Sequence, residues 1–150
     1  MESLRELFKI GKGPSSSHTM GPERAARIIK SRYGKNAEYV VNLYGSLSMT
    51  GKGHLTDYII RETLGEKCKV NFCRETLPLH PNGMIFEVYE GGKLKDTLTA
   101  YSVGGGSIVW EGEDDFSMSR KNVYREKNLK EILETLDRNA YSFYDYVMEH

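Results

Sequence analysis

The second half of the chain contains four short segments whose residue pattern is typical of β-strands. They span residues 69–74, 84–89, 95–101 and 107–111. Gly91-Gly92 lies between the second and third segments, and such a pair predicts a tight hairpin turn. A chain with this many strands must build a sheet, and the sheet needs other elements to cover its apolar face.

The first half of the chain supplies segments that can cover such a sheet. Pro22 begins a predicted helix with apolar residues at helical spacing, and Gly34 is a natural C-terminal stop. Residues 38–44 indicate a strand, and a polar loop from Gly45 leads into a second helix that ends near Leu64. This order predicts an α+β fold, with one mixed β-sheet and helices packed on one of its faces.

Both ends of the chain are also predicted to be helical. Residues 3–8 favour a short helix, and residues 128–136 carry leucine and isoleucine at helical spacing. The aromatic tail favours a helix that packs on the same domain, with a docking surface for a further segment as the alternative. The 150 residues suit a single domain, which we divide into a core of about 1–127 and a C-terminal helical segment of 128–150.

The charge balance argues against two classes of partner. The chain has 21 basic and 21 acidic residues, so no global field attracts nucleic acid or an anionic membrane. No apolar run approaches the roughly 18 residues needed to span a bilayer, and charged residues interrupt the N-terminal segment where a signal peptide would be apolar. We therefore expect a cytoplasmic protein that binds neither nucleic acid nor membrane.

The two cysteines, Cys68 and Cys73, limit the redox and metal chemistry of the chain. Five residues apart on a strand, their side chains would point to opposite faces, so we expect neither a disulfide nor a shared metal. Two thiols are also too few for an iron–sulfur cluster, which normally takes three or four thiolates. We expect no metal site in this chain.

Five consecutive polar side chains, Ser-Ser-Ser-His-Thr at residues 15–19, precede the first predicted helix. Their hydroxyls are short donors and acceptors, and His18 can exchange a proton near neutral pH. The free N–H groups at the start of the helix favour an anion, and Lys12 adds positive charge nearby. We favour a site for a small carboxylate or phosphate over the alternative, capping of the helix by one serine.

Three further polar loops contain candidate site residues. The loop before the second helix carries His54 and Thr56 among glycines that permit close approach of a ligand, although Thr56 would serve equally well as a helix cap. Its Gly-Lys-Gly does not match a nucleotide-binding P-loop. His80 and Asn82 lie in a proline-containing turn that a surface loop would also explain. Residues 104–106 are three glycines, which alone are weak evidence.

Together these loops resemble the β domain of iron–sulfur-dependent L-serine dehydratases. The stretches that carry the resemblance are IGKGPSSSHTMGPERAA, LYGSLSMTGKGHLTD, LHPNGM and YSVGGGS, and the likeness runs from about Leu7 to Ile108. The resemblance implies a fold similar to the allosteric substrate-binding domain of certain phosphoglycerate dehydrogenases. It also implies a β domain or β subunit of a lyase that converts L-serine to pyruvate and ammonia.

The family carries its [4Fe–4S] cluster on a separate catalytic α domain, either fused after the β domain or on a partner chain. The resemblance therefore implies an α domain or subunit and L-serine as partners, a homo-oligomer, and no cofactor and no lyase activity in this chain alone. Iron in such a cluster would act as a Lewis acid on the substrate hydroxyl while a base removes the α-proton.

The same resemblance implies roles for individual residues. His54 would be the base or proton shuttle and His18 would position substrate or deliver a proton, with an exchange of these roles as the alternative. Both roles require the two histidines to lie close together. The predicted substrate-binding residues are Ser15, Ser16, Ser17, Thr19, Lys12, Thr56, His80 and Asn82.

A regulatory module that binds serine or another small anion at residues 15–19 is the alternative function. The resemblance implies that the allosteric domain of the phosphoglycerate dehydrogenases binds a small ligand as such a regulatory module. The pair of histidines favours the catalytic function, because anion binding alone does not need them.

Overall fold

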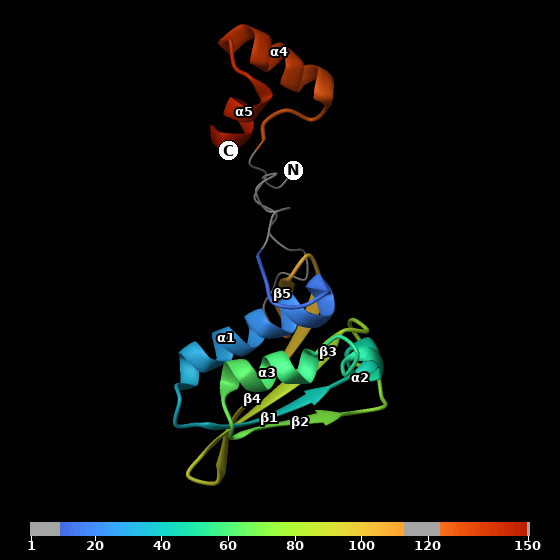
Figure 1. Cartoon of the computed structure of the whole chain (residues 1–150), viewed down its shortest axis with the longest axis vertical. Coiled ribbons are helices and arrows are strands. Elements are labelled where there is room, and N and C mark those ends of the chain that lie inside the picture. The colour runs from blue at the N-terminus through green and yellow to red at the C-terminus, as the bar shows by residue number, and fades with distance from the viewer. Residues whose placement is uncertain (1–9, 113–123, 150) are drawn as a thin grey trace. The chain divides into compact units, whose positions relative to one another are not determined.

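The computed structural model describes residues 10–112 and 124–149, which belong to two compact units (Figure 1). The larger unit contains the described residues 11–112, and a small helical unit contains residues 124–149. The helix predicted over residues 3–8 lies outside the described residues. None of the described helices is both long enough and apolar enough to cross a membrane.

The larger unit is one five-stranded sheet with helices α1 and α3 on one of its faces (Figure 1). Its elements are η2 (Ser16–Met20), α1 (Gly21–Tyr33), β1 (Glu38–Leu43), α2 (Gly45–Thr50), α3 (Thr56–Leu64), β2 (Cys68–Phe72), β3 (Gly83–Glu90), β4 (Lys93–Gly104) and β5 (Ser107–Trp110). The prediction of an α+β fold with a mixed sheet is confirmed.

The strand order is β2-β1-β3-β4-β5. β1 and β2 are parallel, with Val41 opposite Val70, because α2 and α3 form the crossover between them. The remaining neighbours pair antiparallel, and β3 and β4 form the hairpin predicted at Gly91-Gly92. One parallel pair on an otherwise antiparallel sheet makes the sheet mixed.

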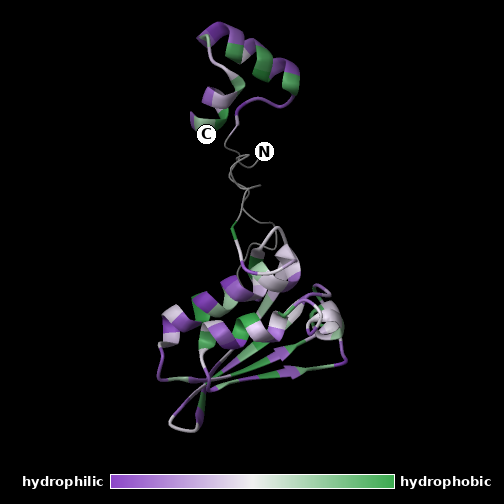
Figure 2. Cartoon of the chain, in the orientation of Figure 1, coloured by the Kyte–Doolittle hydropathy of each residue, from purple (hydrophilic) through white to green (hydrophobic). Residues whose placement is uncertain are grey.

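The core lies between the sheet and the two long helices. Alternation along β1 points Tyr39, Val41 and Leu43 to this side, where Ile29 of α1 and Ile60 of α3 are also fully buried. Figure 2 shows hydrophilic and hydrophobic residues alternating around α1 and α3, as expected for helices that cover one face of a sheet. Each aliphatic side chain of this core, such as Val41 or Ile60, contributes about 1.5–3 kcal/mol to the stability of the fold when it is fully buried.

Two segments differ from the sequence-based prediction. The serine-rich segment before Pro22 is a π-helical turn that continues into α1, because the Ser15 carbonyl accepts from the N–H groups of Thr19 and Met20. The N–H of Gly21 donates to the backbone oxygen of Ser16. The helical run therefore begins at Ser16, and its free N–H groups lie near Ser15 in place of the predicted position at Pro22. The predicted loop that begins at Gly45 contains the short helix α2.

Both cysteine thiols are free, in agreement with the prediction that no disulfide joins them. Cys68 is buried in β2, and burial raises the pKa of its thiol to about 12. Cys73 follows the last residue of β2 and is half-buried. Cys68 is therefore not placed as a reactive thiolate.

The small helical unit consists of α4 (Leu129–Asn139) and α5 (Phe143–Glu149), which confirms the predicted helix over residues 128–136. Asn128 caps α4 by accepting from the N–H of Glu131 at 3.0 Å. The core of this unit contains Tyr124, Ile132, Leu136 and Tyr146. Packing of these helices on the rest of the domain stays a prediction.

Candidate functional site

The two histidines singled out from the sequence lie side by side. His18 is in η2, and His54 lies just before α3. Their ring centroids are 4.9 Å apart and the ring planes are inclined by 32°. Segments 36 positions apart in the chain thus place two imidazoles within reach of one small ligand.

Two buried threonines hold the backbones of these histidines together. The Thr19 hydroxyl donates to the backbone oxygen of His54 at 3.0 Å, and the Thr56 hydroxyl donates to the backbone oxygen of His18 at 2.5 Å. Thr19 is 1% exposed and Thr56 is 0% exposed. We call this reciprocal pair the threonine clasp. Each threonine closely follows one histidine in the sequence and bonds the backbone of the other, so the two histidine segments are held together.

Serine hydroxyls contact both ring nitrogens of His18. Nδ1 lies 2.9 Å from the Ser17 hydroxyl oxygen and 3.4 Å from that of Ser15, and Nε2 lies 2.8 Å from that of Ser46. Burial, and then the nearby charge of His54, lower the pKa of His18 below its usual value. A neutral imidazole has one donor and one acceptor, and hydroxyls can satisfy both.

His54 has a different environment. Its Nδ1 lies 3.1 Å from the backbone oxygen of Thr50, and because a carbonyl oxygen only accepts, Nδ1 carries the hydrogen. In the neutral imidazole the lone pair is then on Nε2, and none of the described residues bonds this nitrogen. Leu55 follows with a left-handed φ of 59°, an unusual conformation for leucine that directs the chain from His54 into α3. His54 is therefore the histidine of the pair whose Nε2 is left unbonded by the described residues.

Hydrogen bonds join four polar segments, residues 15–19, 45–56, 80–82 and 102–106, into a closed ring. The threonine clasp joins the first two. The N–H of Ser46 donates to Pro81 at 2.9 Å, the side-chain amide of Asn82 donates to the backbone of Ser102 at 3.2 Å, and the Ser102 hydroxyl donates to the backbone of Ser17 at 2.7 Å. Ser102 is fully buried. We call this arrangement the four-segment ring.

Two glycines permit the close approach of these segments. A Cβ atom at Gly21 would lie 2.1 Å from the Ser102 hydroxyl oxygen, and one at Gly45 would lie 2.3 Å from the Pro81 carbonyl oxygen. Gly45 also has a φ of 52°, which strains other residues. A side chain at either position would force the ring apart.

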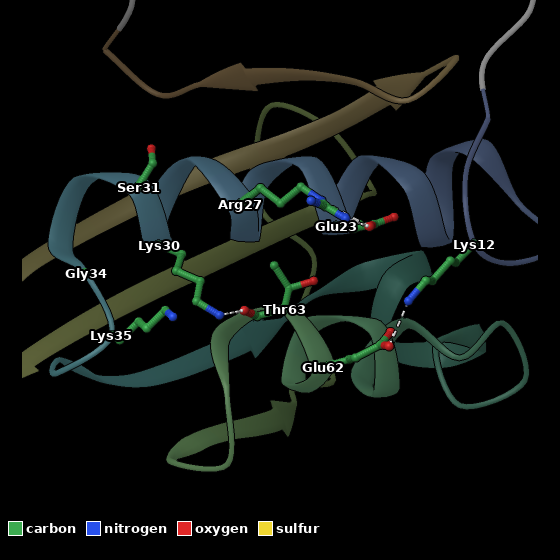
Figure 3. Close-up of a pocket in the computed structure, with 9 residues that line it drawn as sticks. All are labelled: Lys12, Glu23, Arg27, Lys30, Ser31, Gly34, Lys35, Glu62 and Thr63. Carbon is green, nitrogen blue, oxygen red and sulfur yellow. Dashed lines mark hydrogen bonds and ion pairs between the residues drawn. The ribbon is translucent and has the colours of Figure 1, made fainter.

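The other predicted substrate-binding residues occupy several positions. Ser16 is exposed, and no described residue bonds its hydroxyl. His80 accepts the N–H of Asn82 on Nδ1 at 3.0 Å, within the third segment of the ring. Lys12 pairs with Glu62 at 2.8 Å and lines a groove whose lining includes neither histidine of the pair (Figure 3).

Ser46 and Ser102 are two further site residues, which were not predicted from the sequence. Ser46 holds Nε2 of His18, and Ser102 closes the ring. Both lie in stretches that carry the family resemblance, LYGSLSMTGKGHLTD and YSVGGGS. Their position in these stretches is the signal that could have identified them. The residue type alone does not, because a serine can equally be a buried hydrogen-bonding residue or a surface residue.

The residues of this chain do not fit a [4Fe–4S] cluster. The sequence has 2 cysteines, and the thiol of Cys68 is buried with a raised pKa, whereas a cluster takes three or four thiolates. Among the described residues, no group of three or more histidine, cysteine or acidic side chains is placed to hold a metal ion.

Comparison with known proteins identifies the family. A family model described as serine dehydratase beta chain matches residues 3–67 and 61–113. This stretch contains every segment of the four-segment ring. The chain belongs to the serine dehydratase β-chain family.

The related L-serine dehydratases are longer than this chain. L-serine dehydratase 1 of Escherichia coli (strain K12) is 32% identical over 197 residues, covering 100% of this chain and 43% of that protein. The L-serine dehydratase of Haemophilus influenzae is 32% identical over 198 residues, covering 100% and 43%. That of Streptomyces coelicolor is 35% identical over 155 residues, covering 73% and 34%. The chain spans less than half the length of these curated relatives.

Proposed function

We propose that this chain is the β domain or subunit of an iron–sulfur-dependent L-serine dehydratase. In this proposal it acts on L-serine only together with an α domain that carries the [4Fe–4S] cluster, and its own residues supply substrate binding and acid/base chemistry. The observation that carries the proposal is the adjacency of His18 and His54, with centroids 4.9 Å apart, inside the four-segment ring.

His54 is the base in this proposal. Its Nε2 lone pair takes the α-proton of L-serine, and the Thr50 carbonyl that accepts from Nδ1 stabilises the imidazolium that forms. The electron pair of the broken C–H bond becomes the Cα–Cβ double bond as the β-hydroxyl leaves with a proton as water. The resulting aminoacrylate becomes an imine, which water hydrolyses to pyruvate and ammonia.

His18 positions the substrate or delivers a proton. Its two nitrogens already contact the hydroxyls of Ser17 and Ser46, so a proton can pass along this chain of groups. The lowered pKa keeps the ring neutral near pH 7, which supports a relay in preference to a fixed positive charge.

The hydroxyls of residues 15–17 hold the substrate carboxylate, with the exposed Ser16 as the group most available. We assign Thr19 and Thr56 a positioning role in place of substrate contact, because both hydroxyls are buried and bonded in the threonine clasp. Lys12 is the weakest candidate for the carboxylate because its ammonium pairs with Glu62.

A regulatory module is the second candidate function. The exposed Ser16 hydroxyl beside the half-buried Ser15 and Ser17 would suit a small carboxylate without any chemistry. The proposed likeness to the allosteric domain of phosphoglycerate dehydrogenases would favour this second function.

Mixing this chain with a cluster-reconstituted α domain from a relative separates the two functions. We expect pyruvate formation from L-serine by the mixture and none by the chain alone. Full activity of the α domain alone would contradict the proposal. Tight serine binding by the chain, without any rescue of activity, would support the regulatory alternative.

A further inference from the structure

A groove lies between α1 and α3, on the side of the sheet that these helices cover (Figure 3). Its volume is about 660 Å³, which is within the range of small-molecule sites. Basic side chains outnumber acidic ones in its lining. The charged residues are Lys12, Glu23, Arg27, Lys30, Lys35 and Glu62.

Two of the basic residues are already neutralised by the acidic ones. Lys12 pairs with Glu62 at 2.8 Å, and Arg27 pairs with Glu23 at 2.6 Å. Both acidic side chains of the lining are engaged in these pairs. The positive charges of Lys30 and Lys35 therefore have no acidic counterpart in the groove.

Lys30 and Lys35 flank the same end of the groove, beside Gly34 (Figure 3). The Lys30 ammonium donates to the backbone oxygen of Thr63, which is a neutral acceptor and leaves the charge in place. No described residue bonds or pairs with the Lys35 ammonium. Two cations thus face one concave surface that spans two helices.

We propose that this groove binds a small dianion through Lys30 and Lys35. Two ammonium groups can each donate to the oxygens of one phosphate or one dicarboxylate, and such charge-assisted hydrogen bonds are the stronger kind. The C-terminus of α1 lies nearby and carries about half a negative charge, which is smaller than the two positive charges it opposes.

This ligand is distinct from the substrate of the proposed reaction. The lining contains neither His18 nor His54, nor any serine of residues 15–17. A dianion held by Lys30 and Lys35 would therefore lie away from the two histidines, and its binding can be measured without catalytic activity.

Isothermal titration calorimetry of the whole chain at low ionic strength tests the proposal, with inorganic phosphate and malonate as separate probes. We expect the variant Lys30→Gln/Lys35→Gln to bind at least ~10-fold more weakly, since it loses two charge-assisted hydrogen bonds. The matched control is Lys69→Gln/Lys93→Gln, which removes the same charge from exposed positions outside the groove. We expect this control to bind like the unchanged protein.

Backbone amide shifts of the unchanged protein give a second measurement that needs no variant. We expect the probe to shift the amides of Gly34, Lys35 and Thr63 first. Binding of phosphate alone would indicate phosphate esters, and binding of malonate alone would indicate polycarboxylates. Failure of both probes to bind, equal weakening in the two double variants, or shifts confined to other segments would overturn the proposal.

Discussion

The hydroxyl of Thr56 donates to the backbone oxygen of His18, 38 residues earlier in the chain, at 2.5 Å. Thr19 makes the corresponding bond to His54 at 3.0 Å. The spacing of the two imidazoles is therefore set by buried hydroxyls that bond the main chain beneath them. The candidate site depends on these two threonines as much as on the histidines.

Replacing either threonine of the clasp by valine should destabilise the fold. The change keeps the side-chain shape but leaves a buried backbone oxygen without its donor, which costs about 1–3 kcal/mol. Urea unfolding of Thr19→Val and Thr56→Val measures this cost. Thr97→Val on β4 is the control, because Thr97 is exposed. The clasp would have no energetic role if all three variants unfolded alike.

Gly45→Ala should be more disruptive than Gly53→Ala. A Cβ atom at Gly45 meets the Pro81 carbonyl oxygen at 2.3 Å at a φ of 52°, and the left-handed backbone alone costs about 1–2 kcal/mol for a non-glycine residue. A Cβ atom at Gly53 meets its nearest atom, the Thr50 oxygen, at an ordinary 3.5 Å. Thermal unfolding of the two variants compares them, and equal stabilities would contradict the close approach of the second and third segments.

The pKa of His18 should lie below 6.5 in the folded protein, mainly because of burial and secondly because of His54. His54→Gln should raise this pKa only in part, since burial remains. A proton NMR titration of the His18 ring measures both values. A pKa of His18 above 6.5, or one unchanged in His54→Gln, would contradict this electrostatic account.

The same pKa shift sets the sign of a pH effect on stability. Because the folded state disfavours protonation of His18, the unfolded chain binds more protons just below pH 6.5. The contribution of His18 to stability is present above pH 6.5 and is lost as the pH falls through the lowered pKa. His18→Gln should show a weaker dependence of unfolding free energy on pH in this range.

Local sequence patterns were sufficient for the fold class, whereas the pairing of the two histidines needed more than local patterns. Apolar spacing located α1 and α3, and alternation located the strands, because both patterns record which side of an element is buried. Proximity of His18 and His54 followed from a family resemblance of the loops that carry them. No local pattern at either residue specifies the other.

The remaining features depend on contacts between distant segments. The Gly-Ser start of α2 is weak in helix propensity, and α2 forms where the N–H groups of Gly45 and Ser46 donate to Glu75 and Pro81. Lys12 was predicted to hold a substrate anion, and its pairing with Glu62 joins residues 50 positions apart. Such partners are visible only once the chain is folded.

The most direct test of the central claim is the turnover of L-serine by the complex of this chain with a cluster-bearing α domain, comparing His54→Gln with the unchanged chain. We predict that kcat falls by at least ~10²-fold, because the group that takes the α-proton is lost, while assembly of the complex is retained. An unchanged kcat in a correctly assembled complex would contradict the role of His54 as the base.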